Sequence, residues 1–148
     1  MITALSEQDQ RAIQSEMAEF LKKAECQWAA LVDKGGNLFA QCGETHDLDL
    51  GILSALGAGS FAATHELAKR LGEKEFASLY HEGKDMGILM TSLVLDCLLI
   101  TVFNKQTQQG LVRHYIEQLA PTLNALLADA DTRPPEPLQL DPPTAPLF

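Results

Sequence analysis

The stretch that decides the fold is LDLGILSALGAGSFAATHELAKRLG, residues Leu48–Gly72. At the helical repeat of about 100° per residue, its large apolar side chains share one face, which predicts that this face covers a hydrophobic core. These side chains belong to Leu53, Leu56, Phe61, Leu67 and Leu71. The opposite face carries five small residues, which are Gly51, Ala55, Ala58, Gly59 and Ala62. Toward the C-terminal end of the helix, this face continues with Glu66 and Lys69.

The small-residue face is unusual for a helix on a protein surface. Such a helix normally carries long charged residues on its outer side. A glycine inside a helix also costs about 1 kcal/mol relative to alanine. We therefore expect the backbone of a partner to approach this face closely.

The segments before the central helix predict one helix and a β-hairpin. Ser6–Lys23 has helical spacing of its apolar residues and begins with a residue type that caps helices. Gln27–Asp33 and Asn37–Cys42 are short strands, joined by a Lys-Gly-Gly turn that supplies positive φ. Asp47 is the expected N-cap of the central helix, and Gly72 is its expected terminating glycine.

Three strands and a helix are predicted after the central helix. The strands are Phe76–Glu82, Gly87–Leu95 and Cys97–Phe103. The final helix starts near Thr107 and has apolar residues at helical spacing as far as residue 126. Because an interior proline removes a backbone hydrogen bond, we expect a kink or a break at Pro121.

The resulting order is α-β-β-α-β-β-β-α, which predicts an α+β fold with a five-stranded antiparallel sheet. The central helix is expected to cover one face of the sheet, and the terminal helices the other. The third strand should lie at an edge, where an apolar strand without proline invites pairing with a second chain. We expect one domain over residues 1–128 and a proline-rich tail over residues 129–148, which is either solvated or docked weakly on a partner through Leu138, Leu140, Leu147 and Phe148.

Composition restricts the class of partner and the compartment. The chain of 148 residues has a formal net charge of −9, which argues against a nucleic-acid surface or a polybasic membrane anchor. Its three cysteines have no C-x-x-C spacing, and we expect buried, reduced thiols. No signal peptide or membrane-spanning apolar run is visible. We therefore expect a cytoplasmic protein.

Motifs for catalysis and for cofactor binding are incomplete. Gly57-x-Gly59-x-x-Ala62 resembles a dinucleotide fingerprint, but it lies two turns inside a helix rather than directly after a strand. His65-Glu66 is followed by Lys69 where a zinc protease has its second histidine, and no nucleophile elbow or P-loop occurs. We expect no cofactor, no metal and no catalytic site of the chain's own.

Several blocks resemble the Roadblock/dynein-light-chain family, and most closely its bacterial MglB-type branch. The resemblance spans residues 26–119. The matching blocks, in order, are ALVDKGGNLFAQCGET (Ala30–Thr45), LSALGAGSFAATHELAKRLGEKEF (Leu53–Phe76), HEG (His81–Gly83) and TQQGLVR (Thr107–Arg113).

The resemblance implies a homodimer and a GTPase partner. In this family the central helices of two protomers lie side by side, the third strands join into one continuous sheet, and a Ras-like small GTPase binds across the helix pair. MglB-type members are GTPase-activating proteins that act without an arginine finger in the control of cell polarity. The implied GTPase contact is Ala55, Ala58, Ala62, Glu66 and Lys69, and the implied dimer interface is Gly59, Ala63, Phe76, Ser78 and Tyr80.

Two other functions remain open at this stage. The same dimer could be a scaffold that docks a GTPase or other partners without activating hydrolysis. A small-molecule sensor with a pocket between helix and sheet is the third hypothesis, and the absence of convergent polar groups argues against it.

Overall fold

The computed structural model describes residues 5–45 and 47–133, which form three helices and five strands. In chain order these are α1 (Glu7–Ala24), β1 (Trp28–Asp33), β2 (Leu38–Gly43), α2 (Leu50–Arg70), β3 (Ser78–Glu82), β4 (Met86–Ser92), β5 (Cys97–Asn104) and α3 (Gln109–Thr132). The predicted order of elements is confirmed. Residues 93–95, expected at the end of the fourth strand, belong instead to the turn before β5.

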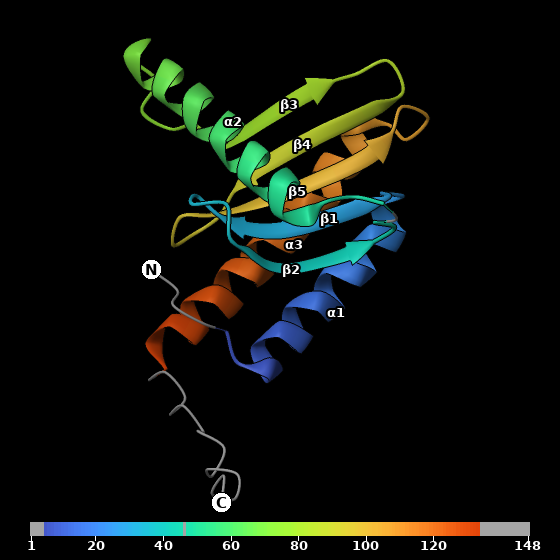
Figure 1. Cartoon of the computed structure of the whole chain (residues 1–148), viewed down its shortest axis with the longest axis vertical. Helices are drawn as coiled ribbons and strands as arrows, with labels where there is room; N and C mark the ends of the chain where they lie inside the picture. The colour runs from blue at the N-terminus through green and yellow to red at the C-terminus, as the bar shows by residue number, and fades with distance from the viewer. Residues whose placement is uncertain (1–4, 46, 134–148) are drawn as a thin grey trace, which may run out of the picture.

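The strands form a single antiparallel sheet in the order β2-β1-β5-β4-β3 (Figure 1). The predicted five-stranded sheet and the edge position of β3 are both confirmed. Strand β5 lies at the centre and is buried along most of its length. Because β3 pairs only with β4 among the described strands, its outer edge is open to a further strand.

Local sequence signals account for most of the turns. Ser6 caps α1 in a reciprocal arrangement with Asp9, in which each residue's backbone N–H donates to the other's side chain. Gly36 in the β1–β2 turn has φ of 85°, a value that glycine adopts without strain. Leu95 and Asp96 adopt φ of 58° and 59°, as a two-residue turn between β4 and β5 requires.

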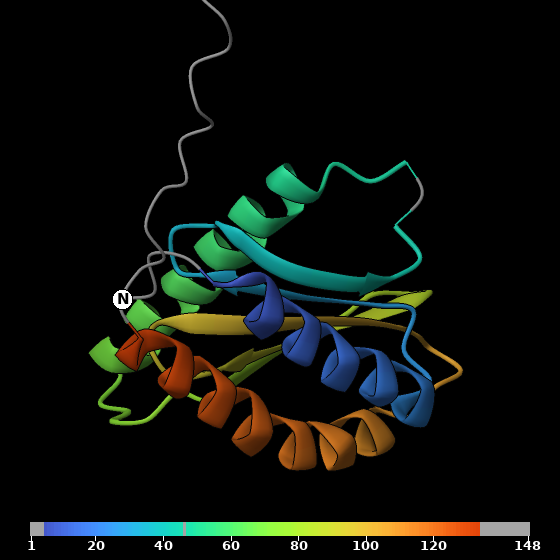
Figure 2. The ribbon, with the colours of Figure 1, turned by 90° about the horizontal axis from the view of Figure 1, so that it is seen from below.

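The sheet separates two hydrophobic cores (Figure 2). Helices α1 and α3 lie side by side on one face, and α2 lies alone on the other. The larger core fills the space beneath the helix pair, and the smaller core lies beneath α2. The smaller core includes Trp28, Phe61, Met90, Leu98 and Ile100.

The buried face of α2 differs from the one expected. Of the five large apolar residues assigned to the core, Phe61 is buried and Leu53 is half-buried, whereas Leu56, Leu67 and Leu71 are exposed. The buried residues of α2 are Ser54, Gly57, Ala58 and Phe61. A Cβ added at Gly57 would lie only 2.6 Å from Ile100 Cδ1, so a small residue there lets the helix approach the sheet closely. The small residues thus serve the core as well as the surface.

The start of α2 also differs from the prediction. Asp49 caps the helix, and its side chain accepts a hydrogen bond from the Ile52 N–H at 3.1 Å. Asp47, the expected cap, has φ of 61° and lies in the turn before the helix. Gly72, with φ of 94°, follows the last turn of α2 as expected.

Helix α3 continues through Pro121 without a break. Glu117, whose carbonyl loses its hydrogen bond to the missing N–H, lies with Pro121 on the exposed side of the helix, where water can replace the bond. The helix ends at Thr132, beyond the expected boundary at residue 128. The predictions for the tail at residues 134–148 fall outside the described residues.

Candidate protein-interaction site

The outward side of α2 carries a row of apolar side chains with no cover in the described chain. We name this row the outer stripe; it consists of Ile52, Leu56, Gly59, Ala63 and Leu67. The three large side chains, Ile52, Leu56 and Leu67, are 58%, 64% and 58% exposed. A contiguous exposed row of this kind marks an interaction surface rather than a scatter of single apolar residues.

Small residues occupy the middle of the outer stripe. Gly59 and Ala63 are exposed, and a Cβ added at Gly59 would meet no atom within 4 Å. Successive residues of the stripe are four, three, four and four positions apart, which keeps them on one side of the helix, as in a helix that packs on another helix. The small residues Gly59 and Ala63 were therefore visible in the sequence as a sign of a helix contact. They lie beside the large apolar residues that were assigned to the core.

The two flanks of α2 face different parts of the sheet. On one flank, Ser60 Oγ lies 3.2 Å from His81 Nε2 in β3. On the other flank, Ala55 lies against the β1–β2 turn, where a Cβ on Gly36 would be 2.9 Å from Ala55 Cα. Leu56 precedes Ser60 by four residues and Leu67 follows it by seven, so both lie on the same side of α2 as Ser60, toward the open edge strand β3.

The residues predicted for the dimer interface lie along this same side of the molecule. Gly59 and Ala63 are on α2, and Phe76, Ser78 and Tyr80 are half-buried in β3 or directly before it. Phe76 packs against Phe61 at a ring-centroid distance of 5.1 Å. Tyr80 stacks on Phe103 at 6.0 Å, on the sheet face that α1 and α3 cover. Both aromatic rings therefore contribute to the fold of one chain, whatever they contact beyond it.

Four of the five residues predicted for GTPase contact are exposed on α2: Ala55, Ala62, Glu66 and Lys69. The fifth, Ala58, is only 3% exposed, because it points toward the sheet rather than outward. The prediction was wrong for Ala58, since a residue between helix and sheet cannot contact a protein that lies on the outside. The four exposed residues lie on the flank of α2 away from β3.

Two arginines, one on α2 and one on the opposite face of the sheet, are bonded to neighbouring side chains. Arg70 Nε lies 3.3 Å from Glu66 Oε1 in an exposed ion pair one turn apart. Arg113, on α3, donates from Nη1 to Ser78 Oγ at 3.5 Å. Exposed pairs of this kind contribute about 0–1 kcal/mol each, so both arginines are held only weakly.

A hydrophobic groove of about 540 Å³ runs between α2 and the sheet on the β3 side. Its walls include Leu53 and Leu56 of α2 and Met86, Ile88 and Met90 of β4. His81 and Ser60 lie at its polar margin. The sequence did not reveal this groove, because it depends on the angle at which α2 crosses the strands.

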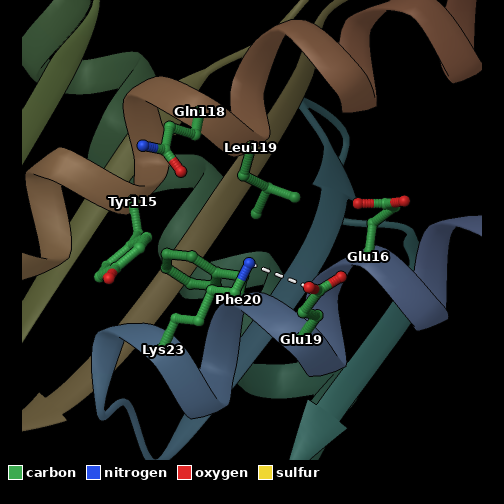
Figure 3. Close-up of a pocket in the computed structure, with 7 residues that line it drawn as sticks. All are labelled: Glu16, Glu19, Phe20, Lys23, Tyr115, Gln118 and Leu119. Atoms are coloured by element: carbon green, nitrogen blue, oxygen red, sulfur yellow. Dashed lines mark ion pairs between the residues drawn. The ribbon is translucent and has the colours of Figure 1, made fainter.

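A second hollow lies on the opposite side of the sheet, between α1 and α3 (Figure 3). It measures about 200 Å³, and its floor is formed by Phe20 and Leu119. Its rim is polar and includes the ion pair between Lys23 and Glu19, whose Nζ and Oε1 atoms are 2.9 Å apart. The hydrogen bond that the Lys23 ammonium donates to Glu19 raises the pKa of Lys23. This hollow is smaller and more polar than the groove beside α2.

The three cysteines are free thiols in protected positions. Burial raises the pKa of Cys26 to about 12, and the pKa values of Cys42 and Cys97 to about 11. At neutral pH all three are therefore protonated and weakly nucleophilic.

Within residues 5–45 and 47–133, no cluster of three histidine, cysteine or acidic side chains is arranged to hold a metal ion. In the same ranges, no helix is both long and apolar enough to cross a membrane.

Comparison with known proteins agrees with this geometry. Residues 14–103 match the sequence model of the Roadblock/LC7 domain. The structure is similar to that of Myxococcus xanthus MglB, with 33% identity, a TM-score of 0.76, and coverage of 79% of this chain and 95% of the other. It is also similar to gliding protein-mglB of Thermus thermophilus, with 27% identity, a TM-score of 0.78, and coverage of 86% and 96%. An uncharacterised protein of Aquifex aeolicus is 28% identical over 125 residues, which are 83% of this chain and 77% of that protein.

Proposed function

The chain belongs to the Roadblock/LC7 family, and on that premise we propose that it is a homodimeric partner and activator of a bacterial Ras-like small GTPase. The observation that carries the proposal is the outer stripe, because three exposed large apolar residues beside an open sheet edge need cover. The similarity to two MglB structures supports the same conclusion.

The homodimer uses the outer stripe and the open edge of β3 together. A two-fold axis perpendicular to the sheet, placed beside β3, pairs this strand with its copy and continues the antiparallel sheet. The same rotation keeps both α2 helices on one face and makes them antiparallel neighbours. Gly59 and Ala63 then permit close approach of the two helices, and Phe76, Ser78 and Tyr80 lie near the joined strands.

The GTPase contacts the flank of each α2 helix that faces away from the second copy. This flank presents Ala55 and Ala62, whose small side chains leave a flat surface, followed by Glu66 and Lys69. A flat helix surface of this kind suits a folded protein partner better than a small ligand, because a small ligand needs a concave site.

Activation does not use an arginine of this chain. Arg70 and Arg113 both lie in helices rather than in loops, and α3, which carries Arg113, covers the sheet face opposite α2, whereas an arginine finger must extend from the docked surface into the partner's active site. The dimer instead favours the GTPase conformation in which the GTPase's own residues are aligned for hydrolysis. The role that we propose is in the cytoplasm, in the control of cell polarity or motility.

Binding is tested by calorimetric titration of the chain with a bacterial Ras-like small GTPase loaded with a non-hydrolysable GTP analogue. Ala62→Arg adds a long charged side chain to the flat flank and should weaken binding by about tenfold or more. Gly110→Arg is the matched control, because Gly110 is exposed on α3 and has no atom within 4 Å of an added Cβ. The proposed surface is wrong if Ala62→Arg remains dimeric and binds as well as the wild type.

The alternative function, a scaffold that binds the GTPase without activating it, has a distinct outcome in the same system. A scaffold would give the same titration curve and the same loss in Ala62→Arg, but the rate of GTP hydrolysis would not change.

A further inference from the structure

The layer formed by α1 and α3 has its own hollow, on the face of the sheet opposite the proposed GTPase contact. In Figure 3 it lies between the two helices, with Phe20 and Leu119 at its floor and Tyr115 beside them. Its volume is about 200 Å³, whereas pockets for drug-sized ligands measure about 300–1,000 Å³. It therefore suits one large apolar side chain rather than a whole small molecule. We name it the α1–α3 hollow; its lining residues are Glu16, Glu19, Phe20, Lys23, Tyr115, Gln118 and Leu119.

The α1 side of this hollow carries one negative charge without a counter-charge. Glu19 is paired with Lys23, whose Nζ atom lies 2.9 Å from Glu19 Oε1, so these two charges balance each other. Glu16 is half-buried and has no hydrogen bond or ion pair to any other residue that the structure describes. A half-buried carboxylate next to an apolar floor is stabilised by a cation, because it is only partly hydrated.

The ammonium of Lys23 shows which kind of group this rim attracts. Its pKa is raised, mainly by the hydrogen bond that it donates to Glu19, and the charge of Glu16 adds to the increase. Figure 3 shows the Lys23 side chain reaching toward Glu19, while Glu16 has no ion pair with the residues drawn. The rim therefore favours positive charge, and the chain itself supplies only one cation for two carboxylates.

The distance between the free carboxylate and the apolar floor corresponds to one turn of a helix. Glu16 precedes Phe20 by four residues in α1, which is about 6 Å along the helix axis. A helix that lies along α1 can meet both features with two side chains three or four positions apart. The side-chain ridges of such a helix also fit the groove between two neighbouring helices.

The chain itself offers no suitable occupant for the α1–α3 hollow. Its C-terminal segment, residues 134–148, contains two acidic residues and no lysine or arginine. A second copy is disfavoured as well, because each chain has a formal net charge of −9 and like charges repel. The same charge attracts a basic partner and speeds its association.

We propose that the α1–α3 hollow binds a basic amphipathic helix of another protein. One large apolar side chain of that helix enters the hollow and packs on Phe20 and Leu119. A lysine or arginine one turn away from this side chain pairs with Glu16. Because α1 and α3 cover the sheet face opposite α2, the chain can hold this partner and the proposed GTPase at the same time.

Selection from a random peptide library tests which partner the hollow takes. Peptides of about 16 residues, since shorter helices are marginal in water, are displayed on phage and selected on the full-length wild-type chain. Phage that also bind the Glu16→Lys variant are removed. We expect the enriched peptides to carry a large apolar residue three or four positions from a lysine or arginine. Enriched peptides without this pair, or no enrichment at all, would overturn the proposal.

Two variants with the same change in net charge separate the hollow from general attraction. Glu16→Lys should weaken the binding of a selected peptide about tenfold or more, as measured by fluorescence anisotropy of the labelled peptide. Glu117→Lys is the matched control, because Glu117 is exposed on α3 but does not line the hollow. We expect this control to change the dissociation constant by less than about twofold. Equal losses in the two variants would overturn the proposal.

Lys23→Ala should have the opposite effect on the same peptide. The substitution frees Glu19 and removes a cation that competes with the cation of the peptide. Affinity should therefore rise about threefold or more, whereas Lys22→Ala, an exposed neighbour outside the hollow, should have little effect. A fall in affinity for Lys23→Ala, or an equal rise for both variants, would contradict a site at the hollow.

Further outcomes distinguish this inference from the proposed function and from contacts between copies. Ala62→Arg, on the opposite face of the sheet, should bind the selected peptide as the wild type does, even where it no longer binds the GTPase. Loss of peptide binding in Ala62→Arg would overturn the separate site. Sedimentation velocity checks for a second copy as the occupant. If the wild-type chain forms assemblies larger than a dimer and Glu16→Lys dissociates them while Glu117→Lys does not, the hollow is a contact between copies and the proposal is wrong.

Discussion

Among single residues, Gly57 has the clearest structural role, because it sets the distance between α2 and the sheet. An added Cβ would lie 2.6 Å from Ile100 Cδ1, so the helix lies closer to β5 than an alanine would allow without a shift of Ile100. Ala58 adds to this close packing. Gly57 and Ile100 both line the groove beside α2, so the residue at position 57 sets the distance between helix and sheet where the groove ends.

Gly59 has a different role, which a substitution can isolate. Gly59→Leu should raise helix propensity by roughly 1 kcal/mol, and the monomer has room for the new side chain. It should nevertheless weaken the dimer, because it prevents close approach of the two helices. Gly110→Leu is the control, since its surroundings are equally open but lie on α3. Sedimentation velocity over a range of concentrations measures the dimer dissociation constants of both variants. If the Gly59→Leu chain dimerises as well as the control, the two α2 helices do not approach closely at Gly59.

The cysteines give a second prediction for individual residues. Burial raises all three thiol pKa values to about 11 or 12, so iodoacetamide at pH 7.5 should modify the folded chain very slowly. In concentrated urea all three thiols should react quickly. Mass spectrometry of the modified chain counts the reacted residues, and rapid modification of the folded chain would mean that these thiols are not protected.

Among the helices, α1 depends on its first turn. Burial opposes ionisation of the Asp9 carboxyl, but hydrogen bonds from Ser6 and the charge of Arg133 outweigh it and hold its pKa below the usual 3.8. Arg133 Nη2 lies 2.7 Å from Asp9 Oδ1, which ties the end of α3 to the start of α1. Ionised Asp9 therefore stabilises the folded chain above pH 3.8, and this stabilisation is lost as the pH falls through the lowered pKa.

Asp9→Ala should reduce the free energy of unfolding by about 1 kcal/mol at pH 7. The difference from the wild type should shrink below pH 3.8, where Asp9 becomes protonated in both the unfolded and the folded chain. Urea denaturation at several pH values measures it. A difference that stays constant down to pH 2 would show that the Asp9 charge does not contribute.

Helix α3 offers a stabilising substitution. Pro121 is exposed in the middle of the helix and lacks the N–H that would bond to the Glu117 carbonyl. Pro121→Ala restores this bond and should raise the free energy of unfolding by about 1–3 kcal/mol. Thermal unfolding followed by circular dichroism provides the measurement. A lower melting temperature would indicate that the proline shapes the helix for packing against α1.

For the whole molecule, local sequence patterns predicted the order of elements, the sheet and the edge position of β3. They succeeded because turns such as Lys34-Gly35-Gly36 and caps such as Ser6 act within a few residues. They failed where the outcome depends on tertiary packing. Periodicity placed Leu56 and Leu67 on the core face, because it weighs large apolar residues above small ones, whereas close contact with the sheet selects Gly57 and Ala58.

The same limit applies to the interaction site. The sequence identified α2 as the helix with two functional sides, and it marked Ala55, Ala62, Glu66 and Lys69, which are exposed. The sequence could not reveal the groove, or that the C-terminal end of α2 extends beyond the sheet. Both features follow from the angle at which the helix crosses the strands. A surface that forms only where two elements pack together leaves no pattern in the sequence of either element.

The proposed function depends most directly on the rate of GTP hydrolysis. Single-turnover GTP hydrolysis by the Ras-like small GTPase that binds the chain should be measured for the GTPase alone, with the wild-type chain, and with Ala62→Arg at equal concentration. We expect the wild-type chain to increase the rate by about tenfold or more and Ala62→Arg to leave it near the intrinsic value. A rate that the wild-type chain does not change, although the two proteins bind, would contradict activation and support the scaffold alternative.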